Sequence, residues 1–324
     1  MEVVVLSNAE VKELLPVTEC IDVMAQALID LTNGDVWQPL RTVMRPPKEA
    51  SVMGMMAAHR SAPAPDYGIK VVCIFPGNRA RGLESHFGTV SLFDGETGAP
   101  LAIVDAGAVT AIRTAAVSAV ATRELARSDA DRLAVLGAGI QARAHLEALA
   151  SVRPFASARI WGRTDAGARA VAEEANVPFP IEVVPSAREA VADADVIATT
   201  TASPEPILAR EWLAPGAHIN AVGSSIPGAR EIDAPTMGAA ALFADRRESF
   251  YAEAGDYLLA VDEIGPREVR AELGEVLTGS GEGRRDDDEL TLFKSLGLAV
   301  EDLAAVEHLY RRALETSAGQ RVEL

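Results

Sequence analysis

Near the middle of the chain runs the stretch Leu133-Ala-Val-Leu-Gly137-Ala-Gly139-Ile-Gln141-Ala142. A short apolar run stops at a Gly-x-Gly turn, and a helix-forming segment follows at once. A dinucleotide-binding βα unit begins in this way. The first glycine permits the tight turn, the second lets a pyrophosphate approach the backbone, and the helix N-terminus faces that anion. Ala142 stands at the third glycine position of the fingerprint, where alanine is tolerated.

The sequence around this turn fits a larger α/β unit. Residues 132–245 alternate apolar strand-like runs with alanine-rich helical stretches, such as 166–175 and 187–192. This alternation predicts a parallel sheet covered on both faces, with ligands bound at the carboxyl ends of its strands. Two loops, 200–204 and 223–228, follow such ends. The expected strands are 132–136, 158–161, 181–184, 196–200, 219–222 and 240–244.

The regions on either side of this unit differ from it. Residues 18–31 read as a helix, and strand-like runs follow at 68–75, 88–93 and 101–104 with Gly- and Pro-containing turns between them. This pattern indicates a separate α+β domain. The C-terminal stretch 300–316 has apolar residues at helical spacing, and the charged loop 279–289 is expected to be solvated surface.

Composition limits the function classes. The chain has 324 residues, enough for two domains, and 30 Lys and Arg against 47 Asp and Glu give a net charge of −17. A chain this acidic is repelled by nucleic acids and anionic membranes, which argues against both as partners.

Cys20 and Cys73 form no C-x-x-C pair, so we expect two reduced, buried thiols. No signal peptide is visible and the histidines lack metal-ligand spacing, so we expect a cytoplasmic protein without a metal site.

Arg113 is the only charged residue between Ala106 and Thr122. Thr110 is a plausible N-cap, which would place Arg113 in the first turn of a small-residue, buried helix. A buried guanidinium needs an anion, and the helix N-terminus would attract the same anion. A substrate carboxylate held by two parallel hydrogen bonds satisfies this need, and so does an internal Asp or Glu. The sequence leaves both alternatives open.

Lys70 lies within an apolar strand-like run, on the same face as Val72 and Ile74. Burial on such a face lowers the pKa of a lysine toward values useful for proton transfer. The alternative is a charged residue that protects an edge strand from unwanted pairing. Arg41 follows Gln38-Pro-Leu at a change from polar to apolar sequence, and it is ambiguous by itself.

Together with several other blocks, these residues resemble the ornithine cyclodeaminase/mu-crystallin family over nearly the whole chain. The blocks are Gly68-Ile-Lys-Val-Val, Pro76-Gly-Asn78, Leu92-Phe-Asp-Gly-Glu-Thr-Gly98, Thr110-Ala-Ile-Arg-Thr-Ala-Ala116, Gly137-Ala-Gly-Ile-Gln-Ala142, His218-Ile-Asn-Ala-Val-Gly223, Thr291-Leu-Phe-Lys-Ser-Leu-Gly297 and Val300-Glu-Asp-Leu303. The resemblance implies a Rossmann domain, residues 116–299, inserted into an α+β substrate and dimerisation domain, residues 1–115 and 300–324. It also implies NAD(P) as cofactor, a homodimer, and a substrate α-carboxylate held by Arg41 and Arg113 with Lys70 beside the reacting carbon–nitrogen bond.

Two departures separate this chain from the cyclodeaminases of that family. Their Gly-x-Asp-x-Pro-Gly loop carries a catalytic Asp, but the position here is Ser225, and the segment 52–59 lacks the Glu that they place before the lysine strand. We therefore expect an NAD(P)H-dependent reductase of small α-imino acids, closer to the imine reductases and amino-acid dehydrogenases of the family. The alternatives are a cyclodeaminase with recycled NAD and an NADPH-dependent small-molecule binding protein. Pyrroline- and piperideine-carboxylates, iminosuccinate and the imine of pyruvate all remain open as substrates.

These arguments give the expected site. Lys70 and Arg113 are the expected catalytic residues, and Arg41, His59 and Ser225 bind the substrate with them. The expected cofactor-binding residues are Thr114, Gly137, Gly139, Ile140, Gln141, Arg163, Thr164, Thr200, Thr201, Val222, Gly223 and Ser224.

The second expected strand of the dinucleotide unit ends at Trp161-Gly-Arg163-Thr164. Folds that prefer NAD usually place an Asp or Glu at this position, where it binds the ribose hydroxyls. Arg163 and Thr164 suit a 2′-phosphate instead. We therefore expect NADP(H) to be preferred, with NAD(H) possible because Asp165 is close by.

Overall fold

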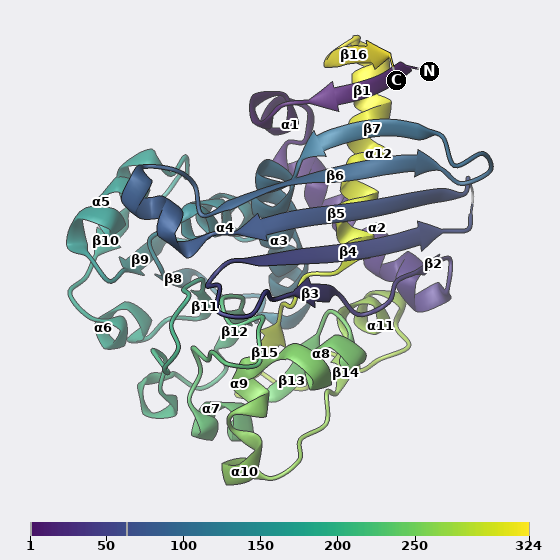
Figure 1. Ribbon diagram of the computed structural model, residues 1–324. Coiled ribbons are helices and arrows are strands. Elements are labelled where there is room, and N and C mark those ends of the chain that lie inside the picture. Colours follow the sequence, from purple (N-terminus) through teal and green to yellow (C-terminus); the bar gives the residue numbers. More distant parts are fainter. Residues whose placement is uncertain (1, 63, 324) are drawn as a thin grey trace. The chain divides into compact units, whose positions relative to one another are not determined.

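The computed structural model describes residues 2–62 and 64–323, and the chain divides into two compact units. The terminal unit comprises Met1–Arg113 and Leu298–Leu324, and the central unit comprises Thr114–Gly297. The central unit is a Rossmann-type domain whose sequence interrupts the α+β terminal unit (Figure 1). The fold class predicted from the sequence is confirmed.

The central unit is built on a parallel sheet with the order β10-β9-β8-β11-β12-β15-β13-β14. Its strands are β8 (Arg132–Leu136), β9 (Ser157–Trp161), β10 (Ile181–Val183), β11 (Val196–Thr199), β12 (His218–Ala221), β13 (Ala241–Ala244), β14 (Ala271–Glu272) and β15 (Thr291–Lys294). The strand order reverses between β8 and β11, the position at which doubly wound sheets bind dinucleotides. The six strands expected from the sequence are all present, each within one residue of its expected ends.

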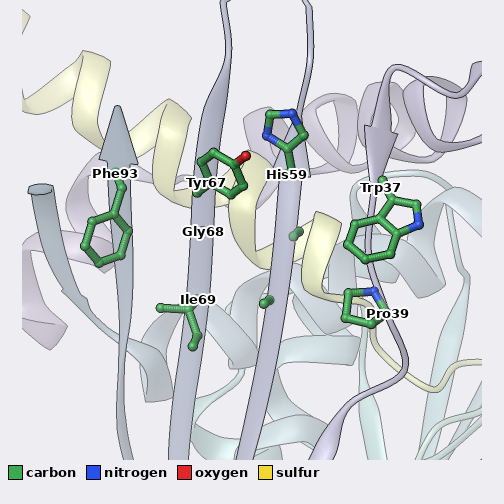
Figure 2. A pocket seen from close by; sticks show the side chains of 9 residues that line it. Trp37, Pro39, His59, Tyr67, Gly68, Ile69 and Phe93 are labelled. Atoms are coloured by element: carbon green, nitrogen blue, oxygen red, sulfur yellow. The ribbon is translucent and has the colours of Figure 1, made fainter. Parts of the chain in front are cut away.

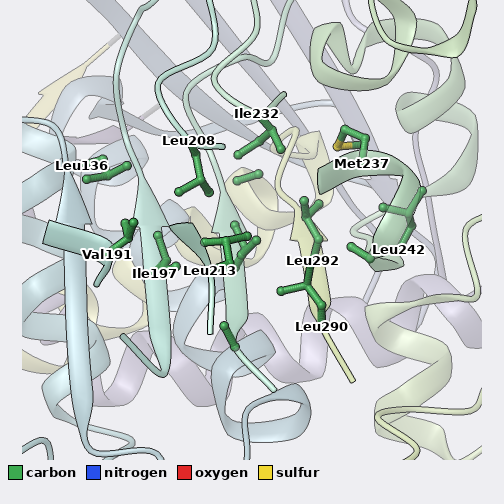
Figure 3. Packing of buried hydrophobic residues seen from close by; sticks show 14 of the residues in the cluster. Leu136, Val191, Ile197, Leu208, Leu213, Ile232, Met237, Leu242, Leu290 and Leu292 are labelled. Atoms are coloured by element: carbon green, nitrogen blue, oxygen red, sulfur yellow. The ribbon is translucent and has the colours of Figure 1, made fainter. Parts of the chain in front are cut away.

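The helices of the central unit follow the expected alternation. They are α4 (Ile140–Ala150), α5 (Asp165–Glu174), α6 (Ala187–Val191), α7 (Ala234–Ala239), α8 (Arg247–Glu253), α9 (Gly255–Leu258), α10 (Val261–Ile264) and α11 (Leu273–Thr278), with a 3-10 turn η2 (Arg210–Trp212). Apolar side chains from strands and helices meet in one buried core, with Leu136 on β8, Ile197 on β11 and Leu292 on β15 (Figure 3). Because the strands are covered on both faces, their sequences are nearly continuous apolar runs.

Two strands of this sheet were not predicted, the two-residue β14 and the more central β15. Residues 291–294 form β15, which lies between β12 and β13 although it follows both in the sequence. Leu292 and Phe293 are fully buried there. The run is too short for periodicity to identify it as a strand, and its place in the sheet depends on the return of a long connection.

The terminal unit contains an eight-stranded sheet with the order β16-β1-β7-β6-β5-β4-β2, and β3 also pairs with β4. The pairing is antiparallel except between β1 and β7. The strands are β1 (Glu2–Leu6), β2 (Val36–Trp37), β3 (Thr42–Met44), β4 (Val52–Arg60), β5 (Asp66–Ile74), β6 (His86–Asp94), β7 (Pro100–Asp105) and β16 (Gln320–Glu323).

Helices cover one face of this sheet. The unit contains α1 (Asn8–Leu14), α2 (Val17–Asn33), α12 (Ala299–Thr316) and a 3-10 turn η1 (Pro76–Arg81), and α3 (Ala106–Leu125) begins in it. In Figure 1, α2 and α12 lie behind the strands. The helix α12 packs tightly on β5 at Gly68. A Cβ atom there would lie only 2.9 Å from Leu303 Cδ1. The opposite face, here called the outer face, bears Trp37, Met44, His59, Tyr67, Ile69 and Phe87.

The structure corrects three expectations for this unit. The helix α3 begins at Ala106 rather than near Thr110, because the Asp105 carboxylate accepts a hydrogen bond from the Ala108 N–H (2.8 Å) at its start. Arg113 therefore lies beyond the first turn, where the field of the helix N-terminus has decayed. The strand β5 lies between β4 and β6, so the edge-strand interpretation of Lys70 is wrong. Both thiols are free, but only Cys20 is buried, whereas Cys73 is half-buried.

Across residues 2–62 and 64–323, the search for a helix with the length and apolar character of a membrane span finds none.

Candidate functional site

A buried cluster of ions forms where β5, α3 and α12 meet in the terminal unit. Lys70 is 4% exposed, and its Nζ lies 2.6 Å from Asp302 Oδ2. The Arg113 guanidinium donates from Nε to Asp302 Oδ1 (3.1 Å) and from Nη1 to Glu301 Oε2 (2.9 Å). Both carboxylates lie in the first turn of α12. The internal partner that the sequence left open for Arg113 is thus present.

The environment of this cluster changes the pKa of Lys70. Burial lowers the pKa of Lys70 to about 8, and the positive charges of Arg113 and Arg41 act in the same direction, against the opposing effect of Asp302. Burial alone would raise the pKa of Asp302, but Lys70 and Arg113 outweigh it and hold that pKa below its usual value. Near neutral pH the pair therefore consists of an ammonium and a carboxylate.

The structure brings Arg41, Lys70 and Arg113 together. Arg41 is half-buried in the connection between β2 and β3, close enough for its charge to lower the pKa of Lys70. Lys70 and Arg113 are paired with Glu301 and Asp302. Arg41 and Arg113 are guanidinium groups, which suit a carboxylate.

His59 does not belong to this cluster, so the structure does not bring it together with Lys70 as the sequence analysis expected. Side chains alternate along a strand, and His59 projects from the outer face while Lys70 projects toward α12. Its ring stacks on Tyr67 with centroids 4.3 Å apart. Figure 2 shows both rings in a hollow that is also lined by Trp37 and Phe93.

The turn after β8 has the form of a dinucleotide cradle. Gly137 has φ +138°, and a Cβ atom there would lie 2.2 Å from Thr200 Oγ1, so only glycine fits. Gly139 is the N-cap of α4, and a Cβ atom on it would meet no described atom within 4 Å. The neighbouring Ile140 is 56% exposed. The open space at this helix N-terminus fits a pyrophosphate.

The end of β9 carries the residues expected to choose between NAD and NADP. The exposed Arg163 lies directly before Thr164, whose hydroxyl oxygen caps α5 by accepting from the Gly167 N–H (3.3 Å). Asp165 is engaged by Arg169 Nε at 2.7 Å on the exposed side of α5. The acidic side chain in this neighbourhood is therefore already paired with a cation.

A buried carboxylate that the sequence analysis missed joins the loops after β11 and β12. Glu231 Oε1 accepts a hydrogen bond from the Thr201 N–H (2.5 Å). Its Oε2 accepts from Thr199 Oγ1 (2.8 Å) and from the Gly223 N–H (2.8 Å). Burial raises the pKa of Glu231 to about 6, and the nearby Asp256 carboxylate adds to the shift.

Asp256 and Lys294 complete this network, and the sequence analysis assigned neither of them to a site. Lys294 Nζ lies 2.9 Å from Asp256 Oδ2 and donates to Ser224 Oγ and to the Ala221 carbonyl oxygen, each at 3.1 Å. Asp256 Oδ1 accepts from the Glu231 N–H (2.7 Å), and Ser224 Oγ donates to its Oδ2. A lysine that ends the apolar run Leu292-Phe293 is the signal that could have identified this network.

The other expected cofactor residues also lie in the central unit. Thr114 is buried on α3, Gln141 lies in the first turn of α4, and Val222 is buried directly after β12. Thr200 Oγ1 donates to the Leu136 carbonyl oxygen (3.2 Å), which ties its loop to the end of β8. Ser225, expected to bind substrate, lies half-buried in the loop 223–228. Among the described residues, no cluster of three His, Cys, Asp or Glu side chains could hold a metal ion.

Comparison with known proteins places this geometry in a family. The sequence profile described as the ornithine cyclodeaminase/mu-crystallin family matches residues 1–317. The chain belongs to that family. The assignment made from the sequence blocks is therefore confirmed.

Three relatives show where in the family the chain lies. Ketimine reductase mu-crystallin of Mus musculus is 43% identical over 278 residues, 86% of each chain. The structure of Thermococcus litoralis Delta(1)-pyrroline-2-carboxylate reductase with NADH and L-proline has a TM-score of 0.94 and 35% identity, covering 98% of this chain and 100% of that one. An archaeal alanine dehydrogenase dimer with bound NAD has a TM-score of 0.93 and 32% identity, covering 100% of both. The expected likeness to the reductase and dehydrogenase members is confirmed.

The cradle generates a prediction about Gly139. Because a Cβ atom there meets no described atom within 4 Å, Gly139→Ala should leave the melting temperature nearly unchanged. It should weaken binding of the reduced nicotinamide dinucleotide at least ~10-fold, since the methyl group would occupy the space that the pyrophosphate needs. Titration followed by nicotinamide fluorescence measures the affinity.

Gly77→Ala is the matched control, because that glycine is exposed in η1 and equally uncrowded by described atoms. If Gly139→Ala bound the cofactor with wild-type affinity, the pyrophosphate would not bind beside Gly139.

Proposed function

We propose that this protein is an NAD(P)H-dependent reductase of small α-imino acids, and that the three cations of the terminal unit hold the substrate. The observation that carries the proposal is the buried Lys70 beside Arg41 and Arg113, in a chain that belongs to this family. Relatives named ketimine reductase and pyrroline-2-carboxylate reductase support an oxidoreductase that acts on carbon–nitrogen bonds.

In this mechanism the residues of the chain bind the imino acid and supply a proton. Arg41 and Arg113 hold the α-carboxylate, and Glu301 and Asp302 fix the Arg113 guanidinium in place. Lys70 Nζ donates a proton to the imine nitrogen as the carbon–nitrogen π bond is reduced, and Asp302 keeps that ammonium oriented. The glycine turn and the loops after β11 and β12 would hold a nicotinamide cofactor, which would supply the hydride for the α-carbon. The product is an α-amino acid.

A cyclodeaminase is the second candidate, and the absorbance at 340 nm separates the two. A reductase consumes NAD(P)H when keto acids are supplied with ammonia or amines, or when cyclic imino acids are supplied. A cyclodeaminase releases ammonia from a diamino acid with no net change in the cofactor. Ser225 at the position of the catalytic Asp favours the reductase.

The proton-donor role of Lys70 predicts a pH dependence. The donor must be protonated and its pKa is about 8, so kcat/KM should be high below that pH and fall as the pH rises through it. Lys70→Met should lower kcat by ~10²–10⁴, while the Kd of NADPH stays within twofold. Steady-state kinetics on one confirmed imino acid, at pH 6 to 10, measure both effects.

Two further variants tie the profile to this lysine. Asp302→Asn removes the charge that raises the Lys70 pKa, so the alkaline limb should move to lower pH. Lys12→Met, at an exposed lysine of α1, should leave the profile unchanged. Turnover at the wild-type rate in Lys70→Met would remove Lys70 from the mechanism.

We further propose a preference for NADPH. Arg163 is exposed at the end of β9, and Asp165, the acidic side chain able to favour NADH, is engaged by Arg169. We expect kcat/KM to be at least ~10-fold higher with NADPH than with NADH, and Arg163→Ala to remove most of that difference by weakening NADPH alone.

Arg188→Ala, at an exposed arginine of α6, is the control for general loss of positive charge. Equal kcat/KM values for the two cofactors in the wild-type enzyme would contradict the preference.

We also propose a homodimer formed through the outer face of the terminal sheet. Tyr67 and Phe87 are 50% and 52% exposed there, and Trp37 is 62% exposed. A sheet face this apolar is typical of a surface covered by another chain. A second copy is favoured as that chain, because the alanine dehydrogenase of the same fold is described as a dimer.

Light scattering at micromolar concentration should therefore give twice the chain mass of 34.1 kDa. Tyr67→Glu should shift the mass toward the monomer, because it buries a charge in the proposed interface. Leu314→Glu, at a residue of α12 that is 50% exposed, should not. A monomeric wild-type protein would overturn this proposal.

A further inference from the structure

The network of Glu231, Asp256 and Lys294 is fully buried, which is unusual for three ionisable side chains. It lies at the carboxyl ends of three neighbouring strands, beneath the loops that follow β11 and β12. None of the proposed substrate-binding or proton-transfer steps uses these residues. Their burial therefore needs a reason of its own.

The charges of the network do not cancel. Lys294 pairs with Asp256 at 2.9 Å, so these two neutralise each other. The three groups that donate to the Glu231 carboxylate, namely the hydroxyl of Thr199 and the backbone N–H groups of Thr201 and Gly223, are uncharged. Ionised Glu231 thus leaves one negative charge in the network, in a medium that screens it poorly.

The position of this charge matches one half of a dinucleotide site. In a doubly wound sheet the two halves each bind one mononucleotide, and the chain reverses between them at β8 and β11. The end of β9 carries the residues that would meet the adenosine ribose. The ends of β11 and β12 therefore belong to the nicotinamide half, and Glu231 joins those two ends.

We infer that Glu231 acts as a fixed negative charge under the nicotinamide half of the site, where it favours the oxidised cofactor and thereby the release of hydride from the reduced one. The nicotinamide ring is neutral when reduced and carries a positive charge when oxidised. A negative charge already in place stabilises the cation that develops as hydride leaves, without any reorganisation. The inference rests on the proposed function for the direction of catalysis, but the effect on cofactor binding does not need a substrate.

The same contacts make Glu231 a positioning residue. By accepting from Thr201 and Gly223, it turns both backbone N–H groups into the protein, and it holds the two loops in close approach. A Cβ atom on Gly223 would lie 1.9 Å from the Thr201 carbonyl oxygen. The loops are thus fixed before the cofactor binds, so a change at Glu231 can act through charge, through loop position, or through both.

The experiment separates these two effects by comparing the oxidised and reduced cofactors. The Kd values of NADP⁺ and NADPH are measured by calorimetry at pH 8, without imino acid, for wild type and Glu231→Gln. Loss of the charge should raise the ratio of the NADP⁺ Kd to the NADPH Kd about five- to ten-fold, as expected for one charge acting over roughly 12–17 Å at an effective dielectric constant of ~20. A ratio within twofold of wild type would overturn the inference.

Two control variants test the alternative of loosened loops. Thr199→Val removes one hydrogen bond to the same carboxylate without changing its charge, so both Kd values should rise by the same factor. If its ratio shifted as far as that of Glu231→Gln, loop position would explain the effect and the charge would not. Glu205→Gln removes an exposed charge after β11 and should leave the ratio unchanged.

A measurement on the wild-type protein keeps the inference testable if Glu231→Gln does not fold. The charged groups that face Glu231 are Asp256 of α9 and Lys294 of β15, and Glu231 itself has a pKa of about 6. Protonation removes the negative charge, so the ratio of Kd values should rise as the pH falls from 8 through 6. The 2′-phosphate titrates in both cofactor forms and cancels in this ratio. A flat ratio would overturn the inference, whereas failure to reduce any imino acid would overturn only the proposed function.

Discussion

The ion cluster of Lys70, Arg113, Glu301 and Asp302 is the constraint on which the terminal unit depends. It joins a central strand, the helix α3 and the first turn of α12, three elements that are far apart in the sequence. Burying these groups is unfavourable unless each charge finds a partner, and removal of one partner from a buried pair typically costs about 3–5 kcal/mol. The ion pairs of this cluster also hold Lys70, whose pKa is lowered, beside the guanidinium groups of Arg41 and Arg113. Under the proposed function, stability and chemistry would share one set of residues.

The central unit solves a related problem in a different way. Its glycine turn leaves open space for a ligand, whereas the loops after β11 and β12 are held from below by buried side chains. Glu231, Asp256 and Lys294 satisfy backbone groups that would otherwise lack partners at the strand ends. A dinucleotide site needs both features, because the pyrophosphate requires room and the ring that reacts requires fixed surroundings.

Much of this arrangement was predictable from the sequence, because it depends on local patterns. The glycines of the Gly137-Ala-Gly139 turn indicate its conformation, and alternation along β5 places Lys70 on an apolar face. Burial of Lys70 and an edge-strand position both remained open until the strand order was known. The sequence blocks that this chain shares with the ornithine cyclodeaminase/mu-crystallin family then identified the family. The partner of Arg113 was not predictable, because Asp302 lies 189 residues away along the chain.

Other features were missed for identifiable reasons. The face on which His59 lies depends on strand register, and a shift of one residue places every side chain on the opposite face. Asp105 ends one strand and also supplies the first cap of α3, so no break in the sequence marks the helix start. The buried network was missed because Glu231 lies in a loop and Asp256 in the four-residue helix α9, where charged residues look exposed. Only their contacts with each other and with Lys294 join them.

The pairing of β1 with β16 has a consequence for how the chain reaches its structure during synthesis. These strands contain the first and last described residues, and they form neighbouring strands of one sheet (Figure 1). The ion cluster likewise cannot form before α12 is synthesised, because α12 supplies both of its carboxylates. Residues 114–297 can leave the ribosome and form their own core while the earlier strands still lack their final partners. The terminal unit must then close over a long separation in sequence, a slow step during which its apolar strands stay accessible to chaperones or to other chains.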